Sequence, residues 1–70
     1  MMPLTFADTG SENIIRKVGG SPEMKKHLED LGFVPGSEVT VMNSIGGNLI
    51  VSIKGSRIAV SKEMASRIMI

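Results

Sequence analysis

Three segments between residues 38 and 60 alternate apolar and polar side chains, and this pattern restricts the chain to a meander of short strands. The segments are 38–43 (EVTVMN), 49–54 (LIVSIK) and 57–60 (RIAV). A period of two residues is typical of strands that bury one face. Glycines separate the segments, at Gly46-Gly47 and at Gly55, where tight turns are favoured. We therefore expect an antiparallel sheet with one aliphatic face.

The turn between the second and third segments sets the register of their hairpin. Gly55-Ser56 fits a two-residue turn of type II′, which takes glycine at its first position. This turn would place Ile53 opposite Ile58 and Val51 opposite Val60. All four of these side chains are branched and apolar, so they define a common inner face of the sheet.

The first segment must share this inner face. Val39 and Val41 then oppose Ile53 and Val51, and pairing odd-numbered with odd-numbered residues requires a loop with an odd number of residues. A five-residue loop over 44–48 meets this condition. On the outer face the same register pairs Glu38 with Lys54 and Met42 with Ile50. Because a sheet this short must curl to bury its inner face, we expect a small, partly open barrel.

A helix is predicted over 22–31. Ser21 can cap it, Pro22 can take its first position, and Glu23 interacts favourably with the positive end of the helix dipole. Its apolar residues recur at i, i+4 and i+7, which brings them onto one face toward the core. These residues are Met24, Leu28 and Leu31.

The run LGFVPG at 31–36 predicts where this helix ends. Gly32 can adopt the positive φ of a helix cap, and Pro35 cannot continue a helix. Val34 is pushed toward extended geometry because it precedes a proline. The run therefore predicts a helix stop that is followed at once by a strand.

Two further strands are predicted from β-branched runs. Residues 14–18 (IIRKV) read as one strand that breaks at Gly19-Gly20, and residues 68–70 read as a closing strand. With the three segments of the meander, these make five predicted strands.

The remaining parts of the chain are shorter elements. Ser61 is positioned to cap a second helix over 62–66. Residues 1–12 are expected to form an extended lead-in, anchored by Leu4 and Phe6. We find no internal repeat and no domain boundary, so residues 1–70 are interpreted as one domain.

The composition excludes several kinds of chemistry. Apolar residues make up 41% of the chain and charged residues 21%, as in ordinary globular domains. Cysteine is absent, which excludes disulfides, thiolate metal sites and cysteine nucleophiles. A net charge of +1 and the lack of Trp and Tyr disfavour nucleic-acid binding. The chain has neither a secretory signal nor an apolar run long enough to span a membrane, so a cytoplasmic location is expected.

Several motifs together resemble the FeoA family of ferrous-iron-transport accessory proteins. Between Ile15 and Gly36 the chain reads I-x-x-V-G-G and then a helix ending L-x-x-L-G-F-V-P-G. Downstream it reads V-x-V, then V-x-I-x-G-x-x-I-A-V, and over 65–70 A-x-x-I-x-I. The same module is similar to the C-terminal domain of DtxR-type metal-dependent repressors. The resemblance implies a mainly β, small α+β fold: an SH3-like antiparallel barrel of five to six strands with inserted helices.

The resemblance also implies a function. FeoA proteins are accessory proteins of ferrous iron transport, so the chain is expected to bind and modulate the cytosolic part of a FeoB-type GTP-binding membrane transporter. The alternative is a metal-linked regulator or peptide-binding SH3-like module that is not tied to iron uptake. Because the sequence contains no catalytic triad and no phosphate-binding loop, we expect no enzyme activity and no cofactor. Neither nucleic-acid binding nor insertion into a membrane is expected.

One facet of the first predicted helix is a candidate metal site. Glu23, His27 and Asp30 share this facet at about 100° per residue, and two carboxylates with an imidazole can bind a divalent cation weakly. The alternative is a solvated face, on which lysines pair with acidic residues four positions away. The family resemblance implies no dedicated metal site.

Apolar side chains on the outer face of the 38–54 hairpin indicate contact with a partner protein or with a second copy of the chain. Met42 and Ile50 lie on that face, and Ile45 lies in the loop between them. Two basic residues at the next turn either are solvated or contact an acidic partner loop. The candidate partner-binding residues are Met42, Ile45, Ile50, Lys54 and Arg57.

Overall fold

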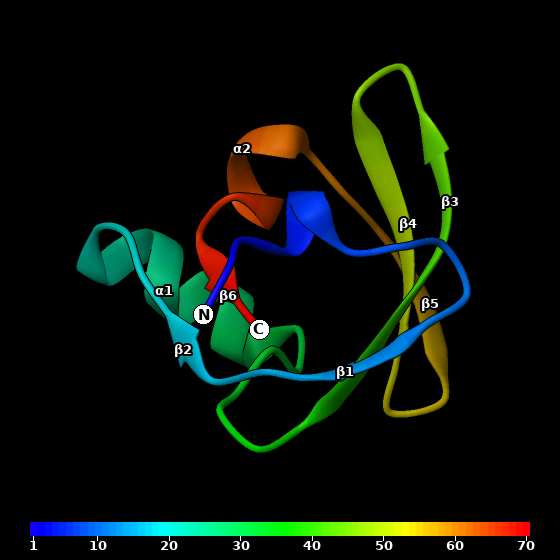
Figure 1. Cartoon of the computed structure of the whole chain (residues 1–70). Coiled ribbons are helices and arrows are strands. Elements are labelled where there is room, and N and C mark those ends of the chain that lie inside the picture. Colours follow the sequence, from blue (N-terminus) through cyan, green and yellow to red (C-terminus); the bar gives the residue numbers. More distant parts are fainter.

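Six short strands pair antiparallel in two sheets in the computed structural model, which describes residues 1–70 (Figure 1). One sheet has four strands in the order β1-β3-β4-β5, and the other consists of β2 and β6. The predicted class, a mainly β antiparallel domain with two helices, is confirmed, and the two sheets do not close into a complete barrel. The elements in chain order are the 3-10 turn η1 (Leu4–Phe6), β1 (Glu12–Ile14), β2 (Lys17–Val18), α1 (Pro22–Asp30), β3 (Glu38–Ile45), β4 (Asn48–Ile53), β5 (Ser56–Val60), α2 (Lys62–Ala65) and β6 (Ile68–Met69).

The two chain ends lie side by side (Figure 1). Met2 and Ile70 exchange two backbone hydrogen bonds of 3.0 and 2.8 Å. The lead-in then forms η1 rather than a fully extended segment. Leu4 is completely buried as expected, but Phe6 is 70% exposed, so its predicted role as an anchor is wrong. With three residues per turn, side chains two positions apart in a 3-10 turn point in different directions, whereas in an extended segment they share a side.

The predicted strand over 14–18 is in fact two strands in different sheets. β1 pairs with β3, and β2 pairs with β6. Between them the Ile15 N–H donates to the Ser37 carbonyl at 2.9 Å, and the Arg16 N–H donates to the Met69 carbonyl at 2.8 Å. The chain therefore changes its partner strand between adjacent residues, and Ile15 is buried at this corner. Local β propensity does not reveal such a change, because it carries no information about the partner strand.

The inner-face register between β3 and β4 is as predicted. The buried pairs are Val39 with Ile53 and Val41 with Val51. The connection between the strands is different. Both strands continue to a two-residue turn at Gly46-Gly47, and the predicted five-residue loop over 44–48 does not form.

A β-bulge in β3 contains the one extra residue that the prediction placed in a five-residue loop. The register shifts by one residue after Val41, so that Asn43 rather than Met42 pairs with Ile50. The predicted pairing of Met42 with Ile50 is therefore wrong. One extra residue in a bulge shifts the pairing by one position, as one extra residue in the loop would. The predicted and the observed hairpin therefore bury the same side chains.

The turn between β4 and β5 lies one position earlier than predicted. It consists of Lys54-Gly55, which have φ of 49° and 79°, as a type I′ turn requires. The register differs from the prediction by two residues, so the inner face is unchanged. Lys54 lies in the turn, and the β3–β4 pairing ends at Val39 with Ile53, so the predicted pairing of Glu38 with Lys54 does not form. The resulting inner-face pairs are Val51 with Ile58 and Leu49 with Val60.

Both α-helices begin with a serine cap, as predicted. Ser21 Oγ accepts a hydrogen bond from the Met24 N–H at 3.2 Å, and Ser61 Oγ accepts one from the Met64 N–H at 3.1 Å. The first N–H groups of a helix have no carbonyl partner within the helix, and each of these two bonds satisfies one of them. α1 and α2 are both one residue shorter than predicted.

The end of α1 connects the helix to the core. Gly32 has a φ of 106°, which confirms its predicted role as a cap. The N–H groups of Gly32 and Phe33 donate to the carbonyls of Glu29 and Leu28, both at 2.9 Å, in the Schellman arrangement. Leu28 and Phe33 are both completely buried.

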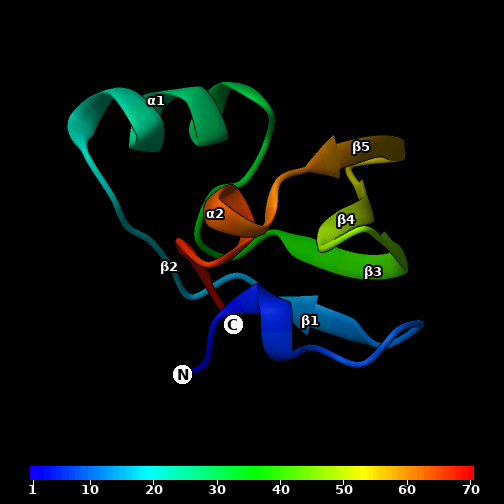
Figure 2. The ribbon, with the colours of Figure 1, turned by 90° about the horizontal axis from the view of Figure 1, so that it is seen from above.

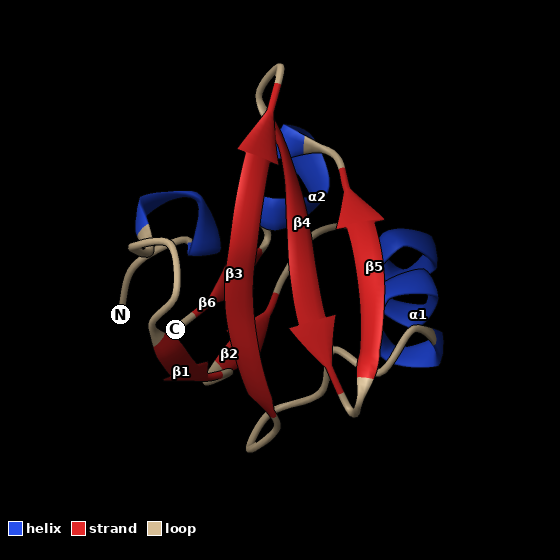
Figure 3. Ribbon diagram, turned by 90° about the vertical axis from the view of Figure 1, so that its right-hand side faces the viewer, coloured by secondary structure: helices blue, strands red, loops and turns tan.

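The core consists of fourteen buried side chains, all of them apolar. Phe33 is the largest of them and the only aromatic one. Met24 and Leu31, the other members of the predicted apolar stripe, are half-buried and pack against this core. Both helices lie on one side of the four-stranded sheet (Figures 2 and 3), which leaves the other face of β3, β4 and β5 without a covering element.

Candidate partner-binding site

The uncovered outer face of β3, β4 and β5 contains the apolar candidates at one of its ends. There the β3–β4 hairpin extends beyond the rest of the sheet (Figures 1 and 3). Ile45, next to the Gly46-Gly47 turn, is 60% exposed, and Met42 is 38% exposed. Ile50 is half-buried. The structure therefore places three predicted residues in the same part of the hairpin, and we call Met42, Ile45 and Ile50 the hairpin tip.

Cross-strand pairs flank the hairpin tip with amide side chains. Ile50 has Asn43 on one side and Ala59 on the other, and Ile45 pairs with Asn48. Both asparagines are exposed. The tip thus combines aliphatic area with groups that can donate and accept hydrogen bonds, a combination that is typical of protein–protein contacts.

The two basic candidates lie at the other end of the face. β4 spans six residues between the two turns, which is about 20 Å at the rise of an antiparallel strand. Lys54 belongs to the second turn, and Arg57 pairs with Ser52 across β4 and β5. Both side chains are exposed. The five predicted residues therefore form two separate groups rather than one continuous patch.

A third basic residue, Lys62, follows β5 at the end of the strand opposite to the Lys54-Gly55 turn. Lys54, Arg57 and Lys62 all fall between Glu38 and Glu63, and no acidic residue lies in that interval. All three basic side chains are exposed. A count of charges by segment would have revealed this basic segment in the sequence. The net charge of +1 does not reveal it, because acidic residues elsewhere in the chain balance these basic ones.

The candidate metal facet lies on α1. Glu23, His27 and Asp30 are all exposed. No group of three or more His, Asp or Glu side chains in the structure comes together in a way that could hold a metal ion. The three residues therefore share a helix facet without forming an assembled set of ligands.

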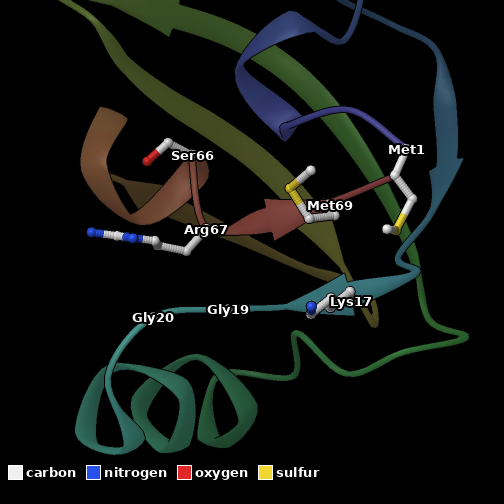
Figure 4. Close-up of a pocket in the computed structure, with 7 residues that line it drawn as sticks. All are labelled: Met1, Lys17, Gly19, Gly20, Ser66, Arg67 and Met69. Carbon is white, nitrogen blue, oxygen red and sulfur yellow. The ribbon is translucent and has the colours of Figure 1, made fainter.

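A pocket beside the β2–β6 sheet was not predicted. Its volume is about 280 Å³, and residues from three segments of the chain line it (Figure 4). Two basic side chains, two methionines and two adjacent glycines contribute to its walls. No local pattern could reveal it, because the pairing of β2 with β6 brings its walls together from opposite ends of the sequence. The lining residues are Met1, Lys17, Gly19, Gly20, Ser66, Arg67 and Met69.

Neither α-helix has the length and apolar character that a membrane-crossing helix requires.

Comparison with known proteins points to one family. The family model described as FeoA domain matches residues 2–70. A curated protein of Methanocaldococcus jannaschii that carries the name "Putative Fe(2+) transport protein A" is 36% identical over 70 residues, covering 100% of this chain and 85% of that protein.

Solved structures share the fold. An iron uptake regulatory protein (FeoA) matches with a TM-score of 0.88 and 31% identity, over 97% of this chain and 90% of the other. A zinc-complexed FeoA of Stenotrophomonas maltophilia, described as a procaryotic SH3 domain protein, matches with a TM-score of 0.85 and 25% identity, over 99% and 88%. A manganese-dependent transcriptional repressor shares the fold alone, with a TM-score of 0.83 and 17% identity, over 94% and 38%. These matches confirm the resemblance that the motifs indicated and the SH3-like class of the fold.

Proposed function

This chain belongs to the FeoA family, and from that membership we propose that it is a non-enzymatic accessory protein of ferrous iron transport that binds and modulates the cytosolic part of a FeoB-type GTP-binding membrane transporter. The observation that carries the proposal is the family match over residues 2–70, supported by 36% identity to a protein named for Fe(2+) transport. An accessory protein of this kind acts on the cytosolic side of the membrane and through contact with the transporter. The proposal therefore requires an exposed protein-binding surface.

The hairpin tip is the surface that we propose for this contact. It extends beyond the rest of the sheet (Figure 3), and its most exposed member, Ile45, is 60% accessible to solvent. Exposed aliphatic side chains with polar neighbours are typical of interfaces, where a few central residues contribute most of the binding free energy. Truncation of such a residue costs more than about 1 kcal/mol.

Binding of the chain to the purified cytosolic domain of the transporter, measured by calorimetry, tests this proposal. Ile45→Asp should weaken binding at least about fivefold, the equivalent of about 1 kcal/mol. Phe6→Asp is a matched control, because Phe6 is 70% exposed but belongs to η1 rather than to the hairpin. This control should bind like the parent chain.

Two other outcomes would change the proposal. If His27→Ala weakens binding and Ile45→Asp does not, the exposed facet of α1 is the contact surface and the hairpin tip is not. If the parent chain does not bind the transporter domain at all, the accessory role is wrong, and the alternative of a regulatory or peptide-binding module takes its place.

A further inference from the structure

The outer edge of β5 has no neighbouring strand. β5 is the last strand of the four-stranded sheet, with β4 on one side only (Figure 3). At five residues it is longer than β1, the three-residue strand at the other edge of the sheet. Proteins usually protect such an edge with charged side chains, proline, a bulge or a covering element; β5 contains Arg57 but no proline, and its pairing with β4 contains no bulge. An edge of this kind can pair with an added strand.

The register shows which backbone groups point outward from this edge. Hydrogen-bonded and non-hydrogen-bonded pairs alternate along an antiparallel ladder, and the pair that flanks a two-residue turn is hydrogen-bonded. Arg57 and Ala59 fall in the alternate positions, so their N–H and C=O groups point away from β4. Outside the strand ladders, no backbone or side-chain hydrogen bond uses these groups. The hydrogen-bonded pairs are Ile53 with Ser56, Val51 with Ile58 and Leu49 with Val60.

The charged residues in β5, in the turn before it and just after it are basic. Lys54 lies in that turn with its side chain beside Gly32 of the α1 cap, Arg57 lies within the strand, and Lys62 follows it. No acidic residue lies between Glu38 and Glu63 in the sequence, so Arg57 has no acidic neighbour along the strand. An extended segment with carboxylate side chains would therefore be attracted to the edge, whereas a basic segment would be repelled.

We infer that β5 binds an extended, acidic segment of a partner protein as an additional strand. Its backbone would bond to the two outward donors and two outward acceptors of Arg57 and Ala59. Its side chains would alternate, with acidic residues beside Arg57 on the outer face and aliphatic residues beside the half-buried Ile58 on the inner face. The inference specifies the partner segment, and it rests on the proposed function only for the identity of the protein that contains that segment.

A second copy of the chain fits the edge less well than an acidic segment. Two β5 strands paired edge to edge would bring the basic side chains of both copies together, which is destabilising. Pairing of β5 with β1 of another copy would be heterologous and would produce rings or open filaments rather than a two-fold symmetric dimer. Growth of the sedimentation coefficient with protein concentration would reveal such assembly and would overturn the inference.

The probe for the test is a capped heptapeptide of alternating glutamate and valine, and the control peptide has lysine in place of glutamate. Amide hydrogen exchange of the full chain is followed by NMR. In the free protein the amides of Arg57 and Ala59 should exchange quickly, whereas those of Ile58 and Val60 should be protected by their bonds to β4. Excess glutamate peptide should slow exchange at Arg57 and Ala59 about tenfold or more, and the lysine peptide should leave it unchanged.

A pair of variants separates edge pairing from binding elsewhere. Ala59→Pro removes one outward N–H at a position where an edge strand tolerates proline, and Ala59→Ser keeps that N–H. Loss of one backbone hydrogen bond should weaken binding of the glutamate peptide about fivefold in Ala59→Pro only. If this variant does not fold, N-methylalanine at position 59, introduced by chemical synthesis, removes the same donor.

Three results would overturn the inference: no binding at millimolar peptide, binding that leaves both amides unprotected, or equal binding of the lysine peptide. The third would show that the basic residues only prevent the edges of two copies from pairing. None of these measurements uses the transporter. The edge site can therefore fail while the accessory role stands, and the accessory role can fail while the edge site stands.

Discussion

At the scale of single residues, Gly32 shows how a local backbone conformation controls packing. Its φ of 106° allows the N–H of Phe33 to reach the carbonyl of Leu28 at 2.9 Å. The side chains of Leu28 and Phe33 are completely buried, so the cap also fixes where the largest core residue enters the interior. A residue with a Cβ is strained at this φ by about 1–2 kcal/mol.

Gly32→Ala should therefore lower the free energy of unfolding by about 1–2 kcal/mol, measured by urea denaturation. The strain comes from φ rather than from a clash, since the nearest atoms to an added Cβ belong to the flexible Lys54 side chain at 3.4 Å. Gly19→Ala is the matched control, because Gly19 does not have a positive φ and an added Cβ would meet only the Arg67 carbonyl oxygen at 3.8 Å. Equal losses in the two variants would contradict this explanation.

At the scale of elements, the β3–β4 hairpin reconciles two requirements through its bulge. The two-residue turn at Gly46-Gly47 pairs odd-numbered with even-numbered residues. Burial of the inner-face valines requires odd-numbered residues to pair with odd-numbered residues. The extra residue at Met42 satisfies both. Met42 itself is 38% exposed and does not belong to the core.

Deletion of Met42 should therefore yield a hairpin without a bulge that buries the same side chains. We expect the variant to fold and to lose no more than about 1 kcal/mol of stability. Deletion of Ser52 is the matched control: β4 has no extra residue to lose, so part of the strand would turn its apolar side chains to solvent and the chain should unfold. Circular dichroism melting curves distinguish the two variants, and unfolding of the Met42 deletion would refute the parity argument.

At the scale of the whole molecule, the core is thin and depends on one aromatic residue. A domain of 70 residues has a stability of about 4–10 kcal/mol. Phe33 is the largest buried side chain, and the other core residues are aliphatic. Its N–H also completes the α1 cap through the hydrogen bond to the Leu28 carbonyl.

Phe33→Ala should cost about 3–5 kcal/mol, which is enough to unfold a large part of the population at 37 °C. The chain contains its own control, since its other phenylalanine, Phe6, is 70% exposed. Phe6→Ala should change the stability by no more than about 0.5 kcal/mol. Thermal unfolding followed by circular dichroism measures both effects, and a larger loss for Phe6→Ala would show that η1 contributes more to the core than its exposure indicates.

The candidate sites were less predictable than the fold. Outer-face positions such as Ile50 follow from the strand period, so part of the hairpin tip could be inferred from alternation alone. The separation of Ile45 from Arg57 could not, because it depends on the position of both turns. The free edge of β5 also required the structure, since the order of strands in a sheet is set by pairings between distant segments.

The sequence alone determined the features that depend on neighbouring residues. These are the serine caps, the glycine cap of α1 and the inner face of the meander, because dihedral preferences and side-chain periods act over a few residues. Only the tertiary structure decided which strands pair, where the bulge lies and which phenylalanine is buried. Each of these depends on contacts between segments far apart in the chain, and several arrangements with the same local patterns bury similar apolar area until the whole core is assembled.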